Sequence, residues 1–588
     1  MANWYASAIG NDSWDGTSGT FVSGTTGPKL TIRAAMALVA ANNDTVSGRS
    51  GDTFTETAGT NGVIEFPAAY TGITVGTYGG TARAVVACPI RTLSITVVVT
   101  GATTVLTSVA HGRAAGQWVS GFSGFTAGGV TGLDGQAINI TATTADTITV
   151  PIDTSGVYTS GGVMSLWEHQ KFCVYNAGSN NATLSNWEVM NGNHGVRMPA
   201  PSASTTTGFL VTGCYVHHNN QHGISSQDTV GTGESTITVA NTVLAYNRND
   251  HVNAQGNTSV PSQGWVKTIA HDNTISYGGF DSDGVASYYT PTGTSARSAD
   301  SGGGDGYTQH GYCYGDYYAS TITYCGQSGV AFVNTNNTSR VWNLLISEVS
   351  GQGITQTSGG AITIFGCMVI SPVVSTPNTK TTGKGNITLS GAGAGLVYNN
   401  TSVTTTGAAN TALVTTNVHG FAFKSHTGTL TYKNNATISN GTAPLICVSL
   451  SGQTNFVSGN NYYSHTTALF LTTNNSQLIS FATWQTKTIG GATLDTTAPQ
   501  TGGTNIVGGS APTDAAGFMP LKTGLLFLNG ADLSGVGITE LLTDYNGRSR
   551  VAASWTIGAL VAASISGGGY GYAAADGAGG GSGYRYQN

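Results

Sequence analysis

Ionisable side chains are concentrated in one part of a chain that otherwise contains few of them. Of the 12 histidines, eight lie between residues 169 and 310, and six aspartates lie between residues 272 and 316. Histidine and aspartate are among the side chains that most often transfer protons in enzymes. Two carboxyl groups flanking a glycosidic bond can hydrolyse it, and grouped aspartates can bind Ca²⁺. We therefore expect chemistry in the middle of the chain.

A repeated pattern gives four of these groups equivalent positions. The segments "NHGV", "QHGI", "NDHV" and "SDGV" each end in an aliphatic residue, and an ionisable residue stands two positions earlier. These ionisable residues are His194, His222, Asp250 and Asp283. If the repeats stack in phase, the four side chains form a column with a spacing of about 4.8 Å. Such a column predicts shifted pKa values and a functional site, whereas a solvated turn with paired His and Asp is the structural alternative.

One repeat is longer than its neighbours. The aliphatic positions of successive repeats are separated by 23 to 31 residues, but Ile275 and Ile322 are 47 residues apart. Long excursions from a rigid scaffold often carry binding function. We therefore predict catalytic groups and ligand contacts at and beside this excursion. The predicted catalytic residues are Asp283, Asp305, His310 and Asp281, and the predicted ligand-binding residues are His194, His222, Asp250, Tyr307 and Tyr312.

Calcium is the only cofactor that the sequence suggests. The aspartates of the excursion are close enough together to hold Ca²⁺, but the segment "DSDG" lacks the remaining ligand positions of an EF-hand loop. We therefore predict no cofactor, keep Ca²⁺ as an alternative and assign no metal ligands. A lyase would need Lys or Arg beside an acidic wall, and only Arg248, Lys267 and Arg297 are near. Hydrolysis is thus favoured as the enzymatic reaction.

Repeats between about residues 165 and 465 indicate the elements that position these side chains. Each repeat contains a short strand, a polar turn and a Gly followed by an aliphatic residue, as in "GCYVHHNNQHGI" and "NLLISEVSGQGI". Units of this size bury their inward side chains only against their neighbours, which is typical of a parallel β-helix. Asn219 and Asn247 share one turn position, and we expect them to form a structural ladder that satisfies backbone groups.

The composition excludes several classes of function. Charged residues make up 8% of the chain and the net charge is −6, so there is no basic surface for nucleic acid. No segment approaches the roughly 18 apolar residues of a membrane span, and the N-terminus lacks the basic and apolar regions of a Sec signal. Seven cysteines without CxxC spacing indicate buried free thiols rather than disulfides or a zinc site.

Both ends of the chain resemble one family. The opening "YASAIGNDSWDGTSG", with Pro28 leading into "LTIRAAMALVAA", resembles the entry segment of Pel-like right-handed β-helix proteins. In that family a helix, here near residues 30–41, caps the first coil. The segment "TDYNGRSRVAASWTIGAL" resembles the closing segment of the same family, with Asp544 and Arg550 in place. Thr556 and Leu560 stand where the family usually has an acidic residue and an aromatic.

Residues 93–163 resemble a small β-barrel insert that recurs in bacteriophage tail proteins. The resemblance is carried by His111-Gly112, the segment "GLDG", Asp146-Thr147-Ile148 and the closing "YTSGG". It implies that His111 has a structural role at a turn. The predicted organisation is a cap with the first coils (1–92), the β-barrel insert (93–163), the β-helix (164–480), a C-terminal β segment (481–560) and a Gly/Ala/Tyr-rich tail (561–588).

The fold class that follows is all-β: a right-handed parallel β-helix solenoid with a small β-barrel insertion and a Gly-rich tail. The resemblance implies a bacteriophage tail spike or fibre, a homotrimeric virion protein that binds a bacterial surface glycan and other virion proteins. Depolymerisation of the glycan would be glycoside hydrolase-like. A non-enzymatic structural spike or adhesin is one alternative, and an exported bacterial polysaccharide hydrolase or lyase is another. No nucleic acid partner and no membrane insertion are expected.

Overall fold

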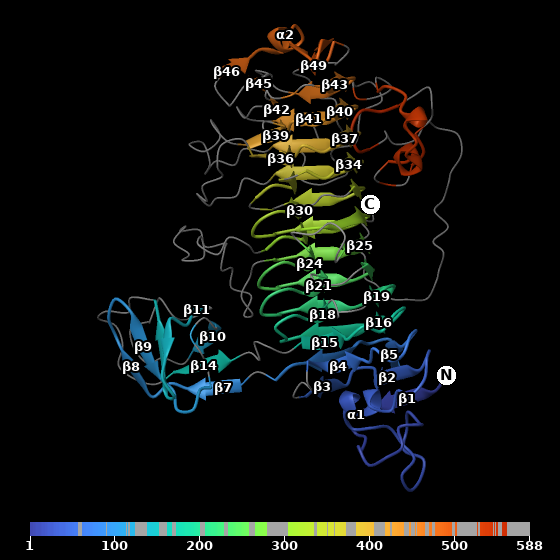
Figure 1. The fold of residues 1–588 in the computed structure, drawn as a ribbon, viewed down its shortest axis with the longest axis vertical. Coiled ribbons are helices and arrows are strands. Elements are labelled where there is room, and N and C mark those ends of the chain that lie inside the picture. The colour runs from blue at the N-terminus through green and yellow to red at the C-terminus, as the bar shows by residue number, and fades with distance from the viewer. Residues whose placement is uncertain are drawn as a thin grey trace, which may run out of the picture.

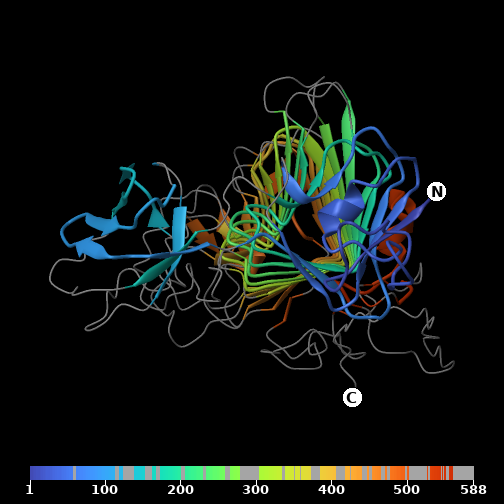
Figure 2. The same cartoon turned by 90° about the horizontal axis from the view of Figure 1, so that it is seen from below.

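Short strands of successive coils pair in parallel and build three long sheets (Figure 1). In the computed structural model each of these sheets contains 13 strands. Seen along the axis, the sheets enclose one interior (Figure 2). The chain is thus a parallel β-helix, as the repeats predict. The structure describes residues 1–56, 61–89, 91–112, 115, 118–123, 138–151, 162–166, 172–199, 206–228, 233–257, 265–278, 304–333, 338–347, 349, 351–357, 359–371, 384–404, 418–423, 426–439, 446–448, 453, 455–464, 470–472, 477–496, 500–501, 526, 530–544, 546, 548–550 and 555–560.

Each complete coil passes through sheet 1, then sheet 2, then sheet 3. Sheet 1 contains β1 (Asn3–Ala6), β2 (Thr45–Arg49), β5 (Thr74–Tyr78), β16 (Thr183–Ser185), β19 (Phe209–Thr212), β22 (Glu234–Ala240), β25 (Trp265–His271), β28 (Cys313–Tyr318), β31 (Ser339–Trp342), β34 (Ile362–Phe365), β37 (Gly395–Tyr398), β40 (Leu430–Lys433) and β43 (Phe456–Gly459). Sheet 2 contains β3 (Thr53–Thr55), β6 (Ala84–Ala87), β17 (Trp187–Met190), β20 (Tyr215–His217), β23 (Val243–Ala245), β26 (Thr274–Ser276), β29 (Thr321–Thr323), β32 (Leu345–Ser347), β35 (Met368–Ser371), β38 (Thr401–Thr404), β41 (Ala436–Ser439), β44 (Tyr462–Ser464) and β49 (Gln500–Thr501).

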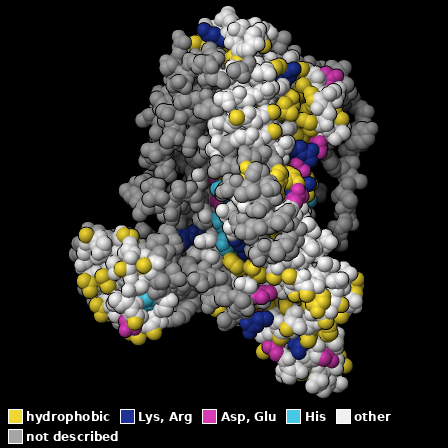
Figure 3. All heavy atoms as spheres, viewed as in Figure 1, with side chains coloured by type: hydrophobic (Ala, Val, Ile, Leu, Met, Phe, Trp, Pro, Cys, Tyr) yellow, Lys and Arg dark blue, Asp and Glu magenta, His cyan; other side chains and the backbone are white. Residues whose placement is uncertain are grey.

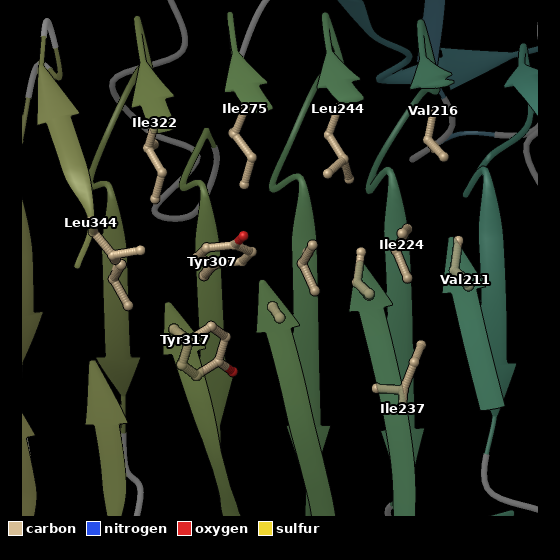
Figure 4. Close-up of a cluster of buried hydrophobic side chains, with 14 of the residues drawn as sticks. Val211, Val216, Ile224, Ile237, Leu244, Ile275, Tyr307, Tyr317, Ile322 and Leu344 are labelled. Atoms are coloured by element: carbon tan, nitrogen blue, oxygen red, sulfur yellow. The ribbon is translucent and has the colours of Figure 1, made fainter. Parts of the chain in front are cut away.

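Sheet 3 carries the candidate site. It contains β4 (Gly62–Phe66), β15 (Phe172–Asn176), β18 (Val196–Pro199), β21 (Ile224–Asp228), β24 (Val252–Gly256), β27 (Tyr307–His310), β30 (Val330–Val333), β33 (Ile354–Gln356), β36 (Lys384–Leu389), β39 (Val418–Phe423), β42 (Ile446–Val448), β45 (Phe470–Thr472) and β46 (Gln477–Ile479). Only its last pair, β45 with β46, is antiparallel. Inward side chains of all three sheets fill the core, where Ile224, Ile275 and Ile322 point to the interior together with Tyr307 and Tyr317 (Figure 4).

Helices cover the two ends of the solenoid. At the N-terminal end, α1 (Ile32–Met36) packs against β1 and β4, and Thr31 caps it by accepting a hydrogen bond from the Ala34 amide at 3.1 Å. The predicted capping helix is therefore present but shorter than residues 30–41. At the other end lie α2 (Phe481–Trp484) and the hairpin of β47 (Thr488–Ile489) and β48 (Ala492–Thr493). No helix of the described residues is long and apolar enough to cross a membrane.

An antiparallel unit leaves the solenoid between β6 and β15 (Figure 1). Its strands are β7 (Arg91–Ser94), β8 (Val97–Val99), β9 (Thr104–Thr107), β10 (Trp118–Ser123), β11 (Ile138–Asn139), β12 (Ala142–Thr143), β13 (Thr147–Val150) and β14 (Val163–Leu166), in two four-stranded sheets. His111 is buried, and its Nε2 lies 3.0 Å from the Thr144 carbonyl, which confirms its structural role. The Sγ atoms of Cys88 and Cys173, on either side of this unit, lie 3.5 Å apart. Whether the unit is a barrel stays a prediction.

The closing segment folds back along the solenoid and contains two 3₁₀ helices, η3 (Ser534–Val536) and η4 (Thr539–Leu542) (Figure 1). The buried Arg550 guanidinium donates hydrogen bonds to the carbonyls of Thr556 and Gly558 at 3.0 and 2.9 Å. The Ala559 amide in turn donates to Thr401 Oγ1 at 2.9 Å. These contacts attach the segment to the outside of coils near β38. The predicted tail, 561–588, lies outside the described residues.

Two ladders of buried amides run along the turns. Asn219 Nδ2 donates to Asn247 Oδ1 at 2.9 Å, which confirms the predicted ladder at the corner between sheets 2 and 3. A longer ladder at the corner between sheets 1 and 2 joins Asn400, Asn435, Asn461 and Asp495, with side-chain distances of 3.0, 3.2 and 2.7 Å. All four side chains of this longer ladder are buried. Their hydrogen bonds satisfy turn backbone that the solenoid would otherwise leave unpaired.

Candidate functional site

Four ionisable residues stand in register at the corner where the chain enters sheet 3. The strands pair Val196 with Ile224, Ile224 with Val252, and Val252 with Tyr307. The residues two positions earlier are therefore His194, His222, Asp250 and Asp305. The in-phase stacking of His194, His222 and Asp250 is confirmed. We call these four residues the column.

The fourth place in the column belongs to Asp305 and not to Asp283, so the sequence prediction is wrong at this position. Asp305-Gly306-Tyr307 repeats the pattern with an aromatic residue where the other coils have an aliphatic one. The long excursion lies before this segment and contains "SDGV", which imitates the pattern. Asp281 and Asp283 fall outside the described residues. In the next two coils the same place is taken by the neutral Ser328 and Gln352.

Both insertions of the chain depart from the corner that carries the column. The antiparallel unit leaves after β6 and rejoins at β15, one coil before His194. The chain leaves again at Gly278 and is described again from Gly304, directly before Asp305. The column therefore lies between the two largest interruptions of the solenoid. Because binding residues are often carried on such connections, this corner is a favourable place for a ligand.

The two histidines of the column stack and are neutral. Their ring centroids lie 5.1 Å apart, and the ring of Phe172 lies 5.3 Å from that of His194. Burial lowers the pKa of His222 to about 3, with smaller contributions from the charges of Arg197 and His310. Burial also lowers the pKa of His194 well below its usual range. Nδ1 of each ring has no hydrogen-bond partner, although His222 Nδ1 lies 3.4 Å from Asp250 Oδ2.

The two carboxyl groups of the column are buried and interact. Asp250 accepts hydrogen bonds from Asn253 Nδ2 at 3.0 Å and from the Asp305 amide at 3.2 Å. Asp305 accepts from Thr308 Oγ1 at 2.7 Å and from the Ser328 amide at 2.6 Å. Burial, followed by the charge of Asp250, raises the pKa of Asp305 to about 7, and burial raises the pKa of Asp250. A carboxyl group with such a pKa can act as an acid at neutral pH.

Arg197 lies next to the column on β18. Its guanidinium is largely buried, and it donates hydrogen bonds to Ser225 Oγ and Gln227 Oε1. Its Cζ atom lies 6.0 Å from the centre of the Phe172 ring. Burial lowers the pKa of Arg197 to about 10. The sequence analysis missed this residue because the equivalent places in the next coils, Ser225 and Asn253, are neutral and show no ionisable repeat.

The remaining predicted residues are spread over sheet 3. His310 lies at the far end of β27 and pairs with Gln255, and burial lowers its pKa. Tyr307 is fully buried, with its hydroxyl donating to Ser320 Oγ at 3.0 Å, so its ring offers no surface to a sugar. Tyr312 follows β27 and faces Trp265, with ring centroids 6.1 Å apart. These two tyrosines are therefore not part of the column.

A stack of aromatic rings follows sheet 2 and was not predicted. His218, Tyr246, Tyr277 and Tyr324 have φ angles of 51° to 56°, which bulky side chains rarely adopt. The tyrosine rings lie 4.8 and 5.0 Å apart with interplanar angles of 4° and 5°. Successive rings cover one another's faces, so the stack stabilises the turns and offers little of its faces to a ligand. The sequence does not reveal this stack, because positive φ angles are normally expected at Gly and Asn and not at Tyr or His.

Among the described residues, no group of three or more His, Cys, Asp or Glu side chains is placed to hold a metal ion. The column therefore offers hydrogen-bonding groups rather than a metal centre within this part of the chain. Histidine and basic side chains reach the surface in the middle of the face seen in Figure 3. The fold and the site define a parallel β-helix protein with a row of polar groups parallel to its axis.

No family model and no curated protein matches the chain. Among solved structures it is similar to a complex of XylC with xylose, at 10% identity and a TM-score of 0.49, over 95% of this chain and 98% of that one. It is also similar to pectate lyase Pel9A, at 12% identity and a TM-score of 0.42, over 96% and 97% of the two chains. The tailspike gp61 of Pseudomonas phage phi297 matches at 12% identity and a TM-score of 0.22, over 74% of each chain. These likenesses are too distant to assign an activity.

Proposed function

We propose that the chain recognises a bacterial surface polysaccharide along the corner that enters sheet 3. The observation that carries this proposal is the column, in which four ionisable groups succeed one another coil by coil. Two of them, His194 and His222, carry a buried Nδ1 atom with no hydrogen-bond partner among the described residues. A row of donors and acceptors parallel to the axis suits an extended polymer with many hydroxyl groups.

The resemblance of residues 93–163 to a phage-tail insert supports a place in a virion, as a tail spike or fibre. In that setting the protein would act outside the cell as a homotrimer beside other virion proteins. An adhesin without catalysis and an exported bacterial polysaccharide hydrolase or lyase are the alternatives. Binding of Ca²⁺ by aspartates of the excursion is also part of the proposal. Asp281, Asp283 and Asp300 of this excursion lie outside the described residues.

The binding proposal is tested with purified full-length protein and purified capsular polysaccharide or lipopolysaccharide from a panel of strains. We expect retention on at least one polysaccharide, and binding weaker by at least tenfold when His194→Asn and His222→Asn are combined. His271→Asn, which changes a histidine paired with Asp272 at the end of sheet 1, is the matched control and leaves binding unchanged. The proposal is wrong if no polysaccharide is retained, or if both sets of variants bind like the original protein.

Hydrolysis of the same polymer is the second candidate function. It is favoured by the raised pKa of Asp305 beside a second carboxyl group, the environment that separates an acid from its partner in glycosidases. If Asp305 is the acid, Asp305→Asn lowers the release of reducing ends by about a hundredfold or more. Asp283→Asn, tested separately, examines the other predicted carboxyl group. Unchanged release in both variants would contradict the assignment, and binding without any release would leave an adhesin.

A further inference from the structure

Arg197 is a half-buried cation without an anion among the described residues. Among the described residues, its guanidinium donates hydrogen bonds to the neutral oxygens of Ser225 and Gln227, and no carboxylate of this part of the chain lies within ion-pair distance. Glu65 lies in the same row of sheet 3, but two coils away, with Tyr175 between them. Removing a cation from water without pairing it is costly, so a protein that buries one usually supplies a counter-charge.

The guanidinium keeps donors that no described residue accepts. It carries five N–H groups, and Ser225 and Gln227 accept two of them. The remaining donors lie in the same fork, which matches the oxygens of a carboxylate or phosphate. Phe172 packs against the guanidinium from the side of the preceding coil. The group is therefore held in place before any ligand arrives, which lowers the entropy that binding must overcome.

His194 and His222 add neutral polar atoms beside this cation. Burial lowers the pKa of both rings, so they are uncharged at neutral pH and Arg197 is the only positive group of the three. His194 is only 6% exposed, and its Nδ1 has no partner. A neutral imidazole can donate from one nitrogen and accept at the other. An anionic group beside Arg197 could accept from these rings while a neighbouring hydroxyl donates to them.

From β18 to β33 the charge of this row is confined to one coil. The places equivalent to Arg197 in the following coils are Ser225, Asn253, Thr308, Ala331 and Thr355, none of which is charged. These neutral places are buried, so Arg197 is the position of this row, from β18 to β33, that can meet an anion.

We propose that Arg197, with His194 and His222 beside it, binds one anionic substituent, a carboxylate or a phosphate, on an acidic bacterial glycan. This inference rests on the proposed function and specifies the chemical class of the ligand. It makes the guanidinium a selective contact, because a neutral glycan would cover it and leave it without a counter-charge.

The test uses the purified capsular polysaccharide of a strain that the protein binds, in three forms. One form is untreated, one has its carboxyl groups reduced to alcohols, and one has its phosphodiesters removed with hydrofluoric acid. We expect the full-length protein to bind the untreated polymer at least tenfold more tightly than one of the two treated forms. Which treatment weakens binding tells whether the anion is a carboxylate or a phosphate.

Arg197→Gln removes the cation and keeps hydrogen-bonding groups of similar size. It should bind the untreated polymer at least tenfold more weakly and bind the effective treated form like the original protein. Arg49→Gln, which removes an exposed arginine from sheet 1, is the control and should change neither affinity. Equal binding of all three polymers by the original protein overturns the proposal, yet leaves polysaccharide recognition standing. If no polymer is retained at all, recognition itself is wrong, and if Arg197→Gln does not fold, the three polymers still decide.

Discussion

Two rows of polar side chains, at two corners of the solenoid, connect successive coils in different ways. At the corner between sheets 1 and 2, Asn400, Asn435 and Asn461 pass hydrogen bonds from coil to coil and end on Asp495, which also accepts from Tyr463 and Trp484. At the corner between sheets 2 and 3, the column stacks rings and carboxyl groups and leaves imidazole nitrogens unpaired. The ladder is joined from coil to coil by direct side-chain hydrogen bonds, whereas the two histidines of the column contact each other through their ring faces.

The largest effect is expected from breaking the satisfied ladder. Asn435→Ala leaves the amide of Asn400 and the carbonyl of Val397 without their partners in the interior. Each orphaned buried group costs about 1–3 kcal/mol, so we expect a loss of about 3 kcal/mol of stability, measured as a lower denaturation midpoint in urea. Asn455→Ala, at an exposed asparagine of the next coil, is the control. Equal midpoints for the two variants would show that the ladder is not the scaffold element described above.

A smaller effect is expected from pH at the column. Burial raises the pKa of Asp305 to about 7, above its ordinary value of 3.8, so its protonated form favours the folded state. The stability that this gives is complete below about pH 3.8 and is lost as the pH rises through about 7. Asp305→Asn cannot ionise. Its melting temperature should therefore rise relative to that of the original protein between pH 4 and pH 8.

The buried histidines make stability rise with pH, which is the opposite of the effect of Asp305. They are present in both proteins, so their contribution cancels when the two melting temperatures are subtracted. Burial lowers the pKa of His222 and of His251 to about 3, so stability from these groups is lost as the pH falls below about 6.5. Asp15→Asn is the control, because hydrogen bonding from the Thr17 amide lowers the pKa of that exposed carboxyl group and the group stays ionised between pH 4 and pH 8. A melting-temperature difference for Asp305→Asn that does not vary with pH would contradict the burial of an interacting carboxyl pair.

The smallest effect is expected at the aromatic stack, which the comparison assigns to the scaffold. Tyr246→Asn has two opposing effects on the free energy of unfolding. Asn tolerates the φ angle of 51° better than Tyr, but the substitution removes the stacking with Tyr277. Backbone relief and lost stacking are each about 1 kcal/mol, so stability should change by less than about 1 kcal/mol. Polysaccharide binding should not change. A loss of binding at unchanged melting temperature would instead make the stack a ligand contact.

The sequence was sufficient for the solenoid because every coil repeats the same strand and turn pattern. The repeat also placed His194, His222 and Asp250 in register, since a fixed step between aliphatic residues fixes the side chains before them. The repeat assigned Asp283 wrongly, because the excursion breaks the regular spacing between aliphatic residues. The segment "SDGV" within the excursion resembles the repeat and is easily mistaken for the segment that contains Asp305. Arg197 was missed for a related reason, since a single charged residue in a neutral row has no period to reveal it.

The hydrogen bonds and pKa values of the two rows depend on contacts between coils, which no local sequence pattern shows. The ladder of Asn400 and Asn435 needs turns of the same conformation in successive coils, and these are visible only when the coils are stacked. The pKa values of the column depend on burial by side chains from several coils. Local sequence therefore indicates which residues share a row, and only the stacked structure shows whether a row is satisfied.

The most direct measurement is a crystal structure of the full-length protein with an oligosaccharide released from a bound polysaccharide. The account predicts an oligosaccharide along the start of sheet 3, with His194 or His222 within hydrogen-bond distance and an acidic substituent on Arg197. An oligosaccharide bound on another face, with the column and Arg197 unchanged and unoccupied, would contradict the claim that the column and Arg197 form the site.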